Sequence, residues 1–254
     1  MQGRSGVQER QLSMAKTAKK VVLFIVEGPT DEDAFSSVMK KLHARQQVVF
    51  LVIHGDITTD RDVNARNALA AVNQKIKELM RKYGLHRTDL LKIIHLVDMD
   101  GAYVPETAIR YGDTDKLMYG LDEIYAPKGN HIVERNRNKA CIINRLCTTH
   151  EISSVPYGLY YLSRNMEHVL FDDMGDLSDE QKMDYADSFA DRYGEDPIGF
   201  VAFMSKSAFA VSGSYRETWL FIKKGTNSLH RWSNLHLALP ATSAEEHLKD
   251  AEHL

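Results

Sequence analysis

VVLFIVEGPTDED, residues 21–33, decides the fold of this chain because an apolar segment runs directly into a carboxylate, a glycine and a helix start. Six consecutive apolar residues rich in β-branched types predict a strand buried on both faces, as in a parallel sheet covered by helices. Glu27 falls at the carboxyl end of this strand. Gly28 and Pro29 interrupt the strand, and we expect Thr30 to cap a helix with an acidic first turn. The same residues would also suit an acid-rich surface turn.

Two further apolar runs, 48–53 (VVFLVI) and 91–97 (LKIIHLV), predict additional buried strands. A helix is predicted between them, over about residues 62–83. The alternation of strands and helices predicts an α/β fold with a mainly parallel sheet and right-handed crossovers. Ligands bind such sheets at the carboxyl ends of the strands. Glu27 and the pair Asp98 and Asp100, which follows the third strand, are therefore predicted to meet there.

Three carboxylates that converge on one crevice repel one another unless a cation lies among them. Oxygen ligands of this kind select a hard divalent ion, so we expect Mg²⁺ as the cofactor, with Mn²⁺ as a substitute. Two aspartates separated by one residue at a strand end can both reach one site, because the chain leaves the sheet there. The acids at 27, 98 and 100 together predict a metal site.

Composition limits the class of protein. With 254 residues, 43% of them hydrophobic, and a formal net charge of -3, the chain suits one globular domain, with or without an elaboration. The longest apolar runs have six residues, far fewer than the roughly 18 that span a bilayer, and no signal-peptide pattern opens the chain. We therefore expect a cytoplasmic protein without membrane association. Cys141 and Cys147 lie six residues apart on a predicted helix and predict neither a disulfide nor a metal site.

The two acidic motifs, Val26-Glu27-Gly28 and Val97-Asp98-Met99-Asp100-Gly101, resemble those of the Toprim domain, the fold shared by topoisomerases, bacterial primases and OLD-type nucleases. The resemblance covers roughly residues 20–170. It implies a Toprim-like (Rossmann-like) sheet flanked by helices, with Glu27, Asp98 and Asp100 as catalytic metal-binding acids.

The sequence EGPTD looks closer to the nuclease branch of this family, in which the acid four residues beyond the glutamate also assists a metal. Asp31 is thereby implied as a further ligand. Glu167 follows a predicted strand at 157–162 and resembles a late acidic motif of OLD-type enzymes. We expect it to be another metal-site acid, with Arg164 or His168 available to phosphate, although a glutamate also favours a helix start.

The expected organisation is a flexible basic leader at 1–20, a catalytic domain at 20–170 with a helical insertion at about 107–150, a helical C-terminal elaboration at 171–240 and a polar tail at 241–254. The insertion contains a basic stretch at 134–145, ERNRNKACIINR. We expect nucleic-acid contacts from its basic residues or, alternatively, a solvated helix packed on the sheet through Ile142, Ile143 and Leu146. The basic residues of this stretch are Arg135, Arg137, Lys139 and Arg145.

A nuclease also needs a cation that stabilises charge on the phosphate in the transition state. Lys206 is the first candidate for this role and Lys223 the second, and Lys223 and Arg164 are also candidate nucleic-acid contacts. Aromatic side chains near Lys223 would suit single-stranded nucleic acid, and would equally suit a helix packed on a core.

The resemblance implies an enzyme, a Mg-dependent endonuclease that hydrolyses phosphodiester bonds in DNA or tRNA. A topoisomerase needs a separate tyrosine domain, and a primase needs zinc-binding and helicase-binding parts that this chain lacks. Small free-standing Toprim nucleases resemble toxic effectors of anti-phage defence, including the PARIS-type effector that works on tRNA and is held by an ATPase. The sequence contains no GxxxxGK[ST] motif, so any ATPase would be a separate chain. It leaves a homo-oligomer open.

Two other classes remain. VDMDGAYVPE at 97–106 also resembles the first motif of haloacid-dehalogenase-like phosphatases, with Asp98 as the nucleophile. That interpretation leaves EGPTD unexplained and has Ala102 where threonine is usual. The other class is a non-catalytic Toprim module, which would bind nucleic acid without cutting it.

Overall fold

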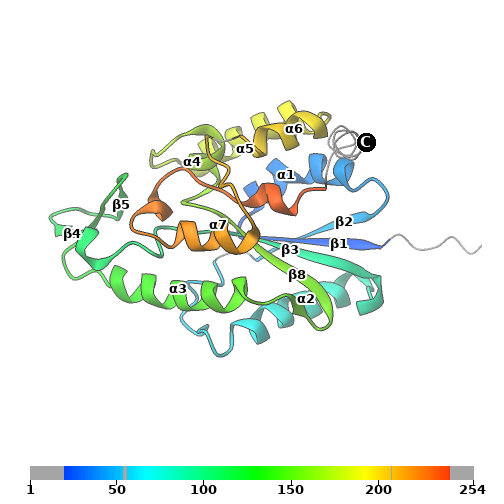
Figure 1. The fold of residues 1–254 in the computed structure, drawn as a ribbon, viewed down its shortest axis with the longest axis horizontal. Coiled ribbons are helices and arrows are strands. Elements are labelled where there is room, and N and C mark those ends of the chain that lie inside the picture. Colours follow the sequence, from blue (N-terminus) through cyan, green and yellow to red (C-terminus); the bar gives the residue numbers. More distant parts are fainter. Residues whose placement is uncertain (1–19, 54–55, 207, 241–254) are drawn as a thin grey trace, which may run out of the picture.

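A central sheet of five strands organises the protein, in the order β2-β1-β3-β8-β7 (Figure 1). The computed structural model describes residues 20–53, 56–206 and 208–240, so the predictions for the leader up to residue 19 and for the tail lie outside the described residues. Strands β1, β2, β3 and β8 are parallel, and only the short β7 is antiparallel. The predicted α/β fold with a mainly parallel sheet is confirmed. The strands are β1 Val21–Val26, β2 Gln47–Val52, β3 Leu90–Asp98, β7 Glu151–Ile152 and β8 Val155–Leu162.

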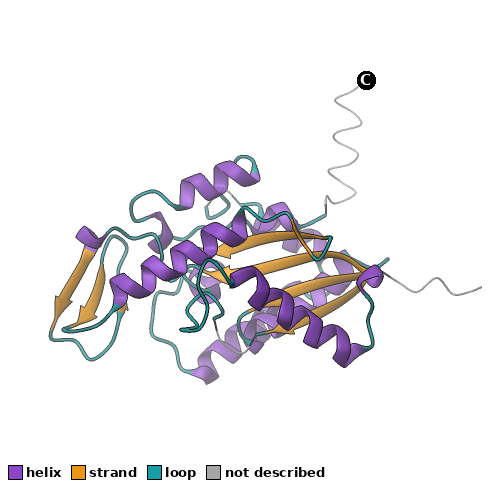
Figure 2. Ribbon diagram, turned by 90° about the horizontal axis from the view of Figure 1, so that it is seen from below, coloured by secondary structure: helices purple, strands orange, loops and turns teal. Residues whose placement is uncertain are grey.

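Helices cover both faces of this sheet (Figures 1 and 2). One face is covered by α1 (Pro29–Leu42), α4 (Met166–Phe171), α5 (Asp179–Tyr193) and α6 (Pro197–Met204). The other face is covered by α2 (Ala68–Tyr83), α3 (Ile132–Cys147) and α7 (Tyr215–Ile222). Short 3₁₀ turns occupy Arg87–Asp89, Glu106–Ala108, Asn227–Leu229 and Leu235–Ala238. Within the described residues, none of these helices combines the length and apolarity needed to cross a membrane.

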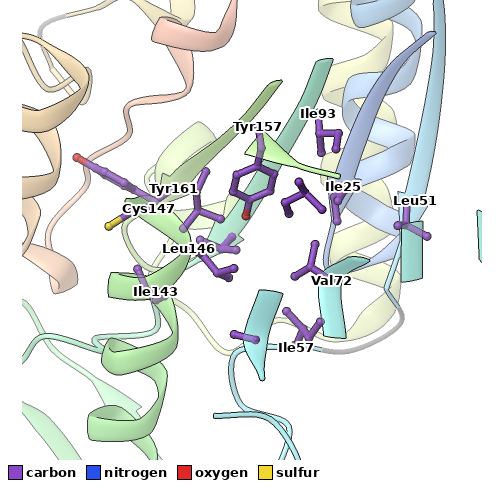
Figure 3. Close-up of a cluster of buried hydrophobic side chains, with 14 of the residues drawn as sticks. Ile25, Leu51, Ile57, Val72, Ile93, Ile143, Leu146, Cys147, Tyr157 and Tyr161 are labelled. Carbon is purple, nitrogen blue, oxygen red and sulfur yellow. The ribbon is translucent and has the colours of Figure 1, made fainter. Parts of the chain in front are cut away.

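All six residues of β1 are buried, because alternate side chains enter the two opposite cores. Figure 3 shows one core, in which Ile25 of β1 and Tyr157 of β8 pack with Val72 of α2 and with Ile143 and Leu146 of α3. The apolar side of α3 is therefore fixed against the sheet, as its sequence predicted. This packing determines where the polar side of α3 lies.

The insertion after β3 contains a second, smaller sheet in addition to α3. Its strands β4 (Ile109–Gly112), β5 (Met118–Tyr119) and β6 (Ile124–Pro127) have the order β4-β6-β5. The small sheet lies beyond the carboxyl end of β3 (Figures 1 and 2). It packs through its own apolar cluster, which includes Val104, Ile124 and Leu229. The expected helical insertion is thus part sheet and part helix.

Two predicted helix starts were wrong. Gly28, not Thr30, is the N-cap of α1, and Pro29 occupies the first helical position, where its missing N–H costs nothing. Helix α2 begins at Ala68 rather than near residue 62. The preceding segment folds into turns in which short polar side chains accept backbone N–H bonds, and such bonds compete with helix formation. These are Thr58 N–H to Asp56 Oδ1 (2.7 Å), Asp62 N–H to Asp60 Oδ1 (2.9 Å) and Asn64 N–H to Asn67 Oδ1 (2.7 Å).

Gly101 should be the least replaceable glycine at the edge that carries the acidic motifs. Its φ is +68°, and an added Cβ would lie 2.9 Å from Ile124 Cδ1 and 3.0 Å from Leu229 Cδ2. We expect Gly101→Ala to lower the free energy of unfolding by about 2–4 kcal/mol, because left-handed strain and overpacking add. Gly84→Ala is the matched control, since Gly84 has φ +62° with no atom within 4 Å of the added Cβ, and it should cost about 1–2 kcal/mol. Urea unfolding that gives equal losses for both variants would contradict the packing role of Gly101.

Candidate functional site

Glu27 connects the ends of the two central strands. It follows β1 directly, and its Oε1 accepts a hydrogen bond of 3.2 Å from the backbone N–H of Asp98, the last residue of β3. Its carboxylate therefore points toward the end of β3, as predicted from the parallel arrangement. The adjacent pairing of β1 and β3 produces this meeting of residues 71 positions apart.

The loop after β3 holds Asp100 in an unusual and well-supported conformation. Asp100 has a positive φ of 46°, which aspartate tolerates better than most residues. Its N–H donates to the carbonyl oxygen of Arg164 (3.3 Å), and its own carbonyl oxygen accepts from Arg135 Nη2 (2.7 Å). Asn136 Nδ2 donates to the carbonyl oxygen of Gly101 (3.1 Å). The loop is thus fixed by residues from β8 and α3, so its carboxylate has a defined place.

Lys139 of α3 supplies a buried positive charge among the acids. Its side chain is fully buried, and Nζ lies 2.5 Å from Asp56 Oδ2 and 2.7 Å from Asp100 Oδ2. Asp56, which comes shortly after β2, also accepts hydrogen bonds from Thr58. Nearby Asp100, Glu27 and Asp56 outweigh the effect of burial and raise the pKa of Lys139 above its ordinary value, so it is an ammonium group. Carboxylates that follow three parallel strands therefore share one ammonium group.

This ammonium group does not balance all the acids. Burial, together with repulsion from Asp56, Asp100 and Asp31, raises the pKa of Glu27 well above its ordinary value despite Lys139. Burial and the charges of Glu27, Asp31 and Asp100 likewise raise the pKa of Asp98. Against the effect of burial, Lys139 and the Thr58 bonds lower the pKa of Asp56. The cluster thus has a compensated side at Asp56 and an uncompensated side at Glu27 and Asp98.

Asp31 and Glu167 extend the uncompensated side. Asp31 caps the first turn of α1 by accepting from the Gly28 N–H (2.9 Å), and its charge acts on both Glu27 and Asp98. Burial raises the pKa of Asp31 to about 6, and the negative charge of Glu167 acts in the same direction. Glu167 is a buried residue in the first turn of α4. The structure therefore brings Asp31 to the cluster directly. Glu167 is connected to the cluster through its effect on Asp31.

The predicted nucleic-acid contacts have different positions. Arg137 and Arg145 are exposed on α3, and Arg137 pairs with Glu106 (2.7 Å). Lys139 cannot contact a phosphate at the surface of this helix, because it is fully buried. Arg135 of α3 is half-buried, and its side chain contacts the loop after β3. Its Nη1 donates to Tyr119 Oη (3.0 Å). The predicted nucleic-acid contact is therefore wrong for Lys139, which is buried. For Arg135, Arg137 and Arg145 it stays a prediction.

The lysines proposed for transition-state stabilisation lie elsewhere. Lys206 is exposed after α6, with Nζ 5.0 Å from the centre of the Phe203 ring. Lys223 is half-buried after α7, with Nζ 3.5 Å from Cys147 Sγ and near the rings of Tyr103 and Trp219. The charge of Lys139 acts on both Glu27 and Asp98 and lowers their pKa values against the effect of burial. Lys139 replaces both lysines as the cation of the cluster.

One hollow adjoins the acidic cluster, and a second lies beside the start of α3. The first, of about 350 Å³, is lined by Asp100 together with Lys116, Arg164, Asp176 and Lys182. The second, of about 820 Å³, is lined by Arg61, His131, Glu134 and Arg135. Arg164 is largely buried, and its guanidinium donates to the carbonyl oxygens of Tyr119 (3.1 Å) and Met174 (2.9 Å). Each hollow therefore has basic side chains in its lining.

The donor set suits a hard divalent ion in its chemistry. The charges of Asp31, Asp56 and Asp100 act on Glu27, and those of Glu27, Asp31 and Asp100 act on Asp98, with Lys139 as the buried ammonium group among them. Carboxylate oxygens are the ligands that Mg²⁺ selects. Among the described residues, no three His, Cys, Asp or Glu side chains are already grouped closely enough to hold a metal ion. The cluster has the excess of negative charge that attracts a divalent ion. Its carboxylates would have to move closer together to bind one.

Comparisons of the chain with protein-family models, with curated proteins and with solved structures found no match. The case for a function therefore depends on the site itself. Asp56 and Lys139 were the two members of the cluster that sequence reasoning missed. Asp56 follows the apolar run 48–53 after two intervening residues, so an acid soon after β2 was an available signal.

Loss of the Lys139 charge should destabilise the protein strongly. Lys139→Met leaves Asp56 and Asp100 without a partner, and removing one member of a buried ion pair costs about 3–5 kcal/mol. Lys139 is charged throughout pH 5–8, so the pH dependence comes from Asp56, Glu27 and Asp98, whose pKa values the charge of Lys139 lowers and its loss would raise. The folded state of the variant then binds more protons than its unfolded state, and the loss should be larger at pH 8 than at pH 5. Lys128→Met is the control, because Lys128 forms an exposed pair with Asp113 and should change stability by at most about 1 kcal/mol. Equal losses for both variants in urea unfolding would rule out a compensating role for Lys139.

Asp98→Asn should stabilise the protein in the absence of divalent ions. The raised pKa of Asp98 means that the folded state binds a proton more tightly than the unfolded state, so wild-type stability falls as pH rises above the unfolded value. At pH 8 the variant should be more stable by about 1–3 kcal/mol, and the gap should shrink toward pH 5. Thermal unfolding with EDTA and then with Mg²⁺ measures both effects, since Mg²⁺ should stabilise wild type more than the variant. Exposed Asp184→Asn on α5 is the control, with a change within about 0.5 kcal/mol. A variant less stable than wild type at pH 8 would contradict this.

Proposed function

We propose that this chain is a metal-dependent nuclease that hydrolyses phosphodiester bonds of DNA or RNA, including tRNA. The observation that carries the proposal is the Glu27 carboxylate, which accepts from the Asp98 N–H and thereby joins the acids of separate strand ends in one cluster. These acids belong to the two motifs that resemble the Toprim domain. The basic side chains that line the two hollows support a polyanionic substrate.

Glu27, Asp98 and Asp100 are the residues that would hold Mg²⁺ or Mn²⁺, and Asp31 and Glu167 are further candidate ligands. A divalent ion bound there supplies Lewis acidity toward a phosphoryl oxygen and a lowered pKa of bound water. Asp56 is excluded from this set because Lys139 already compensates its charge. The acids assigned to the cofactor are therefore the uncompensated Glu27 and Asp98, together with Asp100, whose carboxylate also contacts Lys139.

Two residues of the chain have roles of their own in this proposal. Glu27 joins the ends of β1 and β3, and its raised pKa, caused by burial and neighbouring acids, reflects a repulsion that a bound divalent ion would relieve. Lys139 keeps Asp100 oriented and contributes positive potential where phosphate charge develops. Lys139 thus replaces Lys206 as our candidate for the cationic group.

The cellular role follows only from the resemblance. It suggests a toxic effector of anti-phage defence that a separate ATPase chain restrains. Induced expression of wild type should then arrest growth, whereas Glu27→Gln should not.

Cleavage assays with purified protein test the activity. Wild type should cut at least one of plasmid DNA, single-stranded DNA and tRNA in Mg²⁺ or Mn²⁺, and EDTA should abolish cutting. Glu27→Gln should lower the rate by about 10²-fold or more, because it removes a charged ligand of the divalent ion. The matched control is Glu151→Gln, an exposed glutamate in β7. Equal rates for wild type and Glu27→Gln would refute the role of the cluster.

The same preparation separates the alternative classes. A haloacid-dehalogenase-like phosphatase would hydrolyse p-nitrophenyl phosphate and form a phospho-aspartate at Asp98. A non-catalytic module would bind the labelled nucleic acids and cut none of them under any metal condition. Each outcome would replace the nuclease proposal with a different one.

A further inference from the structure

We propose that the hollow beside Asp100 is a subsite for one unpaired nucleotide, which makes single-stranded or looped nucleic acid the substrate class. This inference rests on the proposed nuclease function and specifies its substrate. The hollow has a volume of about 350 Å³, within the usual range of small-molecule sites. Asp100 belongs both to its lining and to the acidic cluster, so the subsite adjoins the proposed reaction centre.

The walls of the hollow are suited to a flat aromatic base. Leu117 and Met118 line it from the small sheet, and Met174 and Leu177 line it from the segment before α5. Apolar surfaces from two separate segments can contact the faces of a base, and such contacts do not depend on its identity. A base in a duplex is stacked on both sides and must leave the stack before it can enter such a pocket.

The two walls are held together by Arg164. One of its terminal nitrogens, Nη1, donates to the Tyr119 carbonyl oxygen in β5, and the other, Nη2, donates to the Met174 carbonyl oxygen in the segment before α5. The guanidinium also lies 5.2 Å from the centre of the Tyr119 ring. The pocket is therefore preorganised by a largely buried residue, which reduces the entropy lost when a ligand binds.

Charged and polar groups at the pocket suit a phosphate and a base edge. Lys116 pairs with Asp176, whereas the ammonium group of Lys182 makes no ion pair within the part of the chain that the structure describes. The charge of Lys182 acts on Asp31, so this lysine lies toward the acidic cluster. Asn165 uses Oδ1 to cap α4, which leaves its Nδ2 group as a donor at the pocket wall. A nucleotide would place its base between the walls and its phosphate near Lys182.

Binding of labelled oligonucleotides to the Glu27→Gln variant without added metal tests the subsite separately from cleavage. The probes are a 12-nucleotide strand as DNA and as RNA, its duplex, and a set of strands with one abasic position each. We expect the unpaired strand to bind more tightly than the duplex, and one abasic position to weaken binding by about 5- to 100-fold. The DNA and RNA arms distinguish the two sources of the nucleotide.

A second variant identifies the pocket as the place where the base binds. Leu177→Ala should weaken binding of the intact strand and abolish the penalty of the critical abasic position. Leu220→Ala on α7, whose leucine is 51% exposed, is the matched control and should behave like the parent. Lys182→Gln should reduce affinity for all strands alike, whereas exposed Lys40→Gln on α1 should have a small effect.

Equal affinity for duplex and unpaired strands, no sensitive abasic position, or a penalty that persists in Leu177→Ala would overturn the subsite. Base-dependent binding by a protein that cuts nothing would retain the subsite and remove the nuclease activity. Efficient cleavage without any base-dependent binding would do the reverse.

Discussion

A single buried ammonium group determines how the carboxyl edge of the sheet is assembled. Lys139 joins α3 to Asp56 and Asp100, which follow β2 and β3. Burying several carboxylates together costs free energy that packing alone does not repay, so this positive charge permits the strand ends to be enclosed. Because Lys139 lies on the same buried face of α3 as Ile143 and Leu146, which pack on the sheet, the hydrophobic core fixes the position of the ammonium group. The geometry of the acidic cluster therefore depends on the core.

Lys139 neutralises the carboxylates of the cluster unequally, so negative charge remains at one part of the carboxyl edge of the sheet. Lys139 lowers the pKa of Asp56 against the effect of burial, while Glu27 and Asp98 keep raised pKa values despite the same ammonium group. Repulsion is therefore concentrated where β1 and β3 end side by side. A second cation would relieve most repulsion at that position, whereas it would gain little beside Asp56. The charge distribution thus separates a structural half of the cluster from a half that can bind and react.

The sequence predicted those features that depend on local pattern. A continuous apolar run identified β1 residue for residue, and the position of Glu27 after it predicted the meeting with Asp98 and Asp100. The burial of Lys139 had a local signal, because its spacing of i+4 to Ile143 and i+7 to Leu146 puts it on the apolar face of α3. Its partner Asp56 could not be predicted from that spacing, because it lies 83 residues away in the sequence. The small sheet was not predicted for a different reason. Strands of two to four residues show too little alternation of polar and apolar residues to be recognised in a sequence.

The division between core and periphery bears on how substrate preference could change. The acids come from the ends of core strands, whereas the walls of the adjoining hollow come from the small sheet and the segment before α5. Arg164 links those walls through backbone carbonyl oxygens, so side chains such as Leu117 or Leu177 can change without breaking the link. Asp100 is the exception, because its carboxylate binds Lys139 while the residue lines the hollow. Substitutions in the walls should therefore alter recognition and leave the charge cluster intact, whereas any change at Asp100 must affect both.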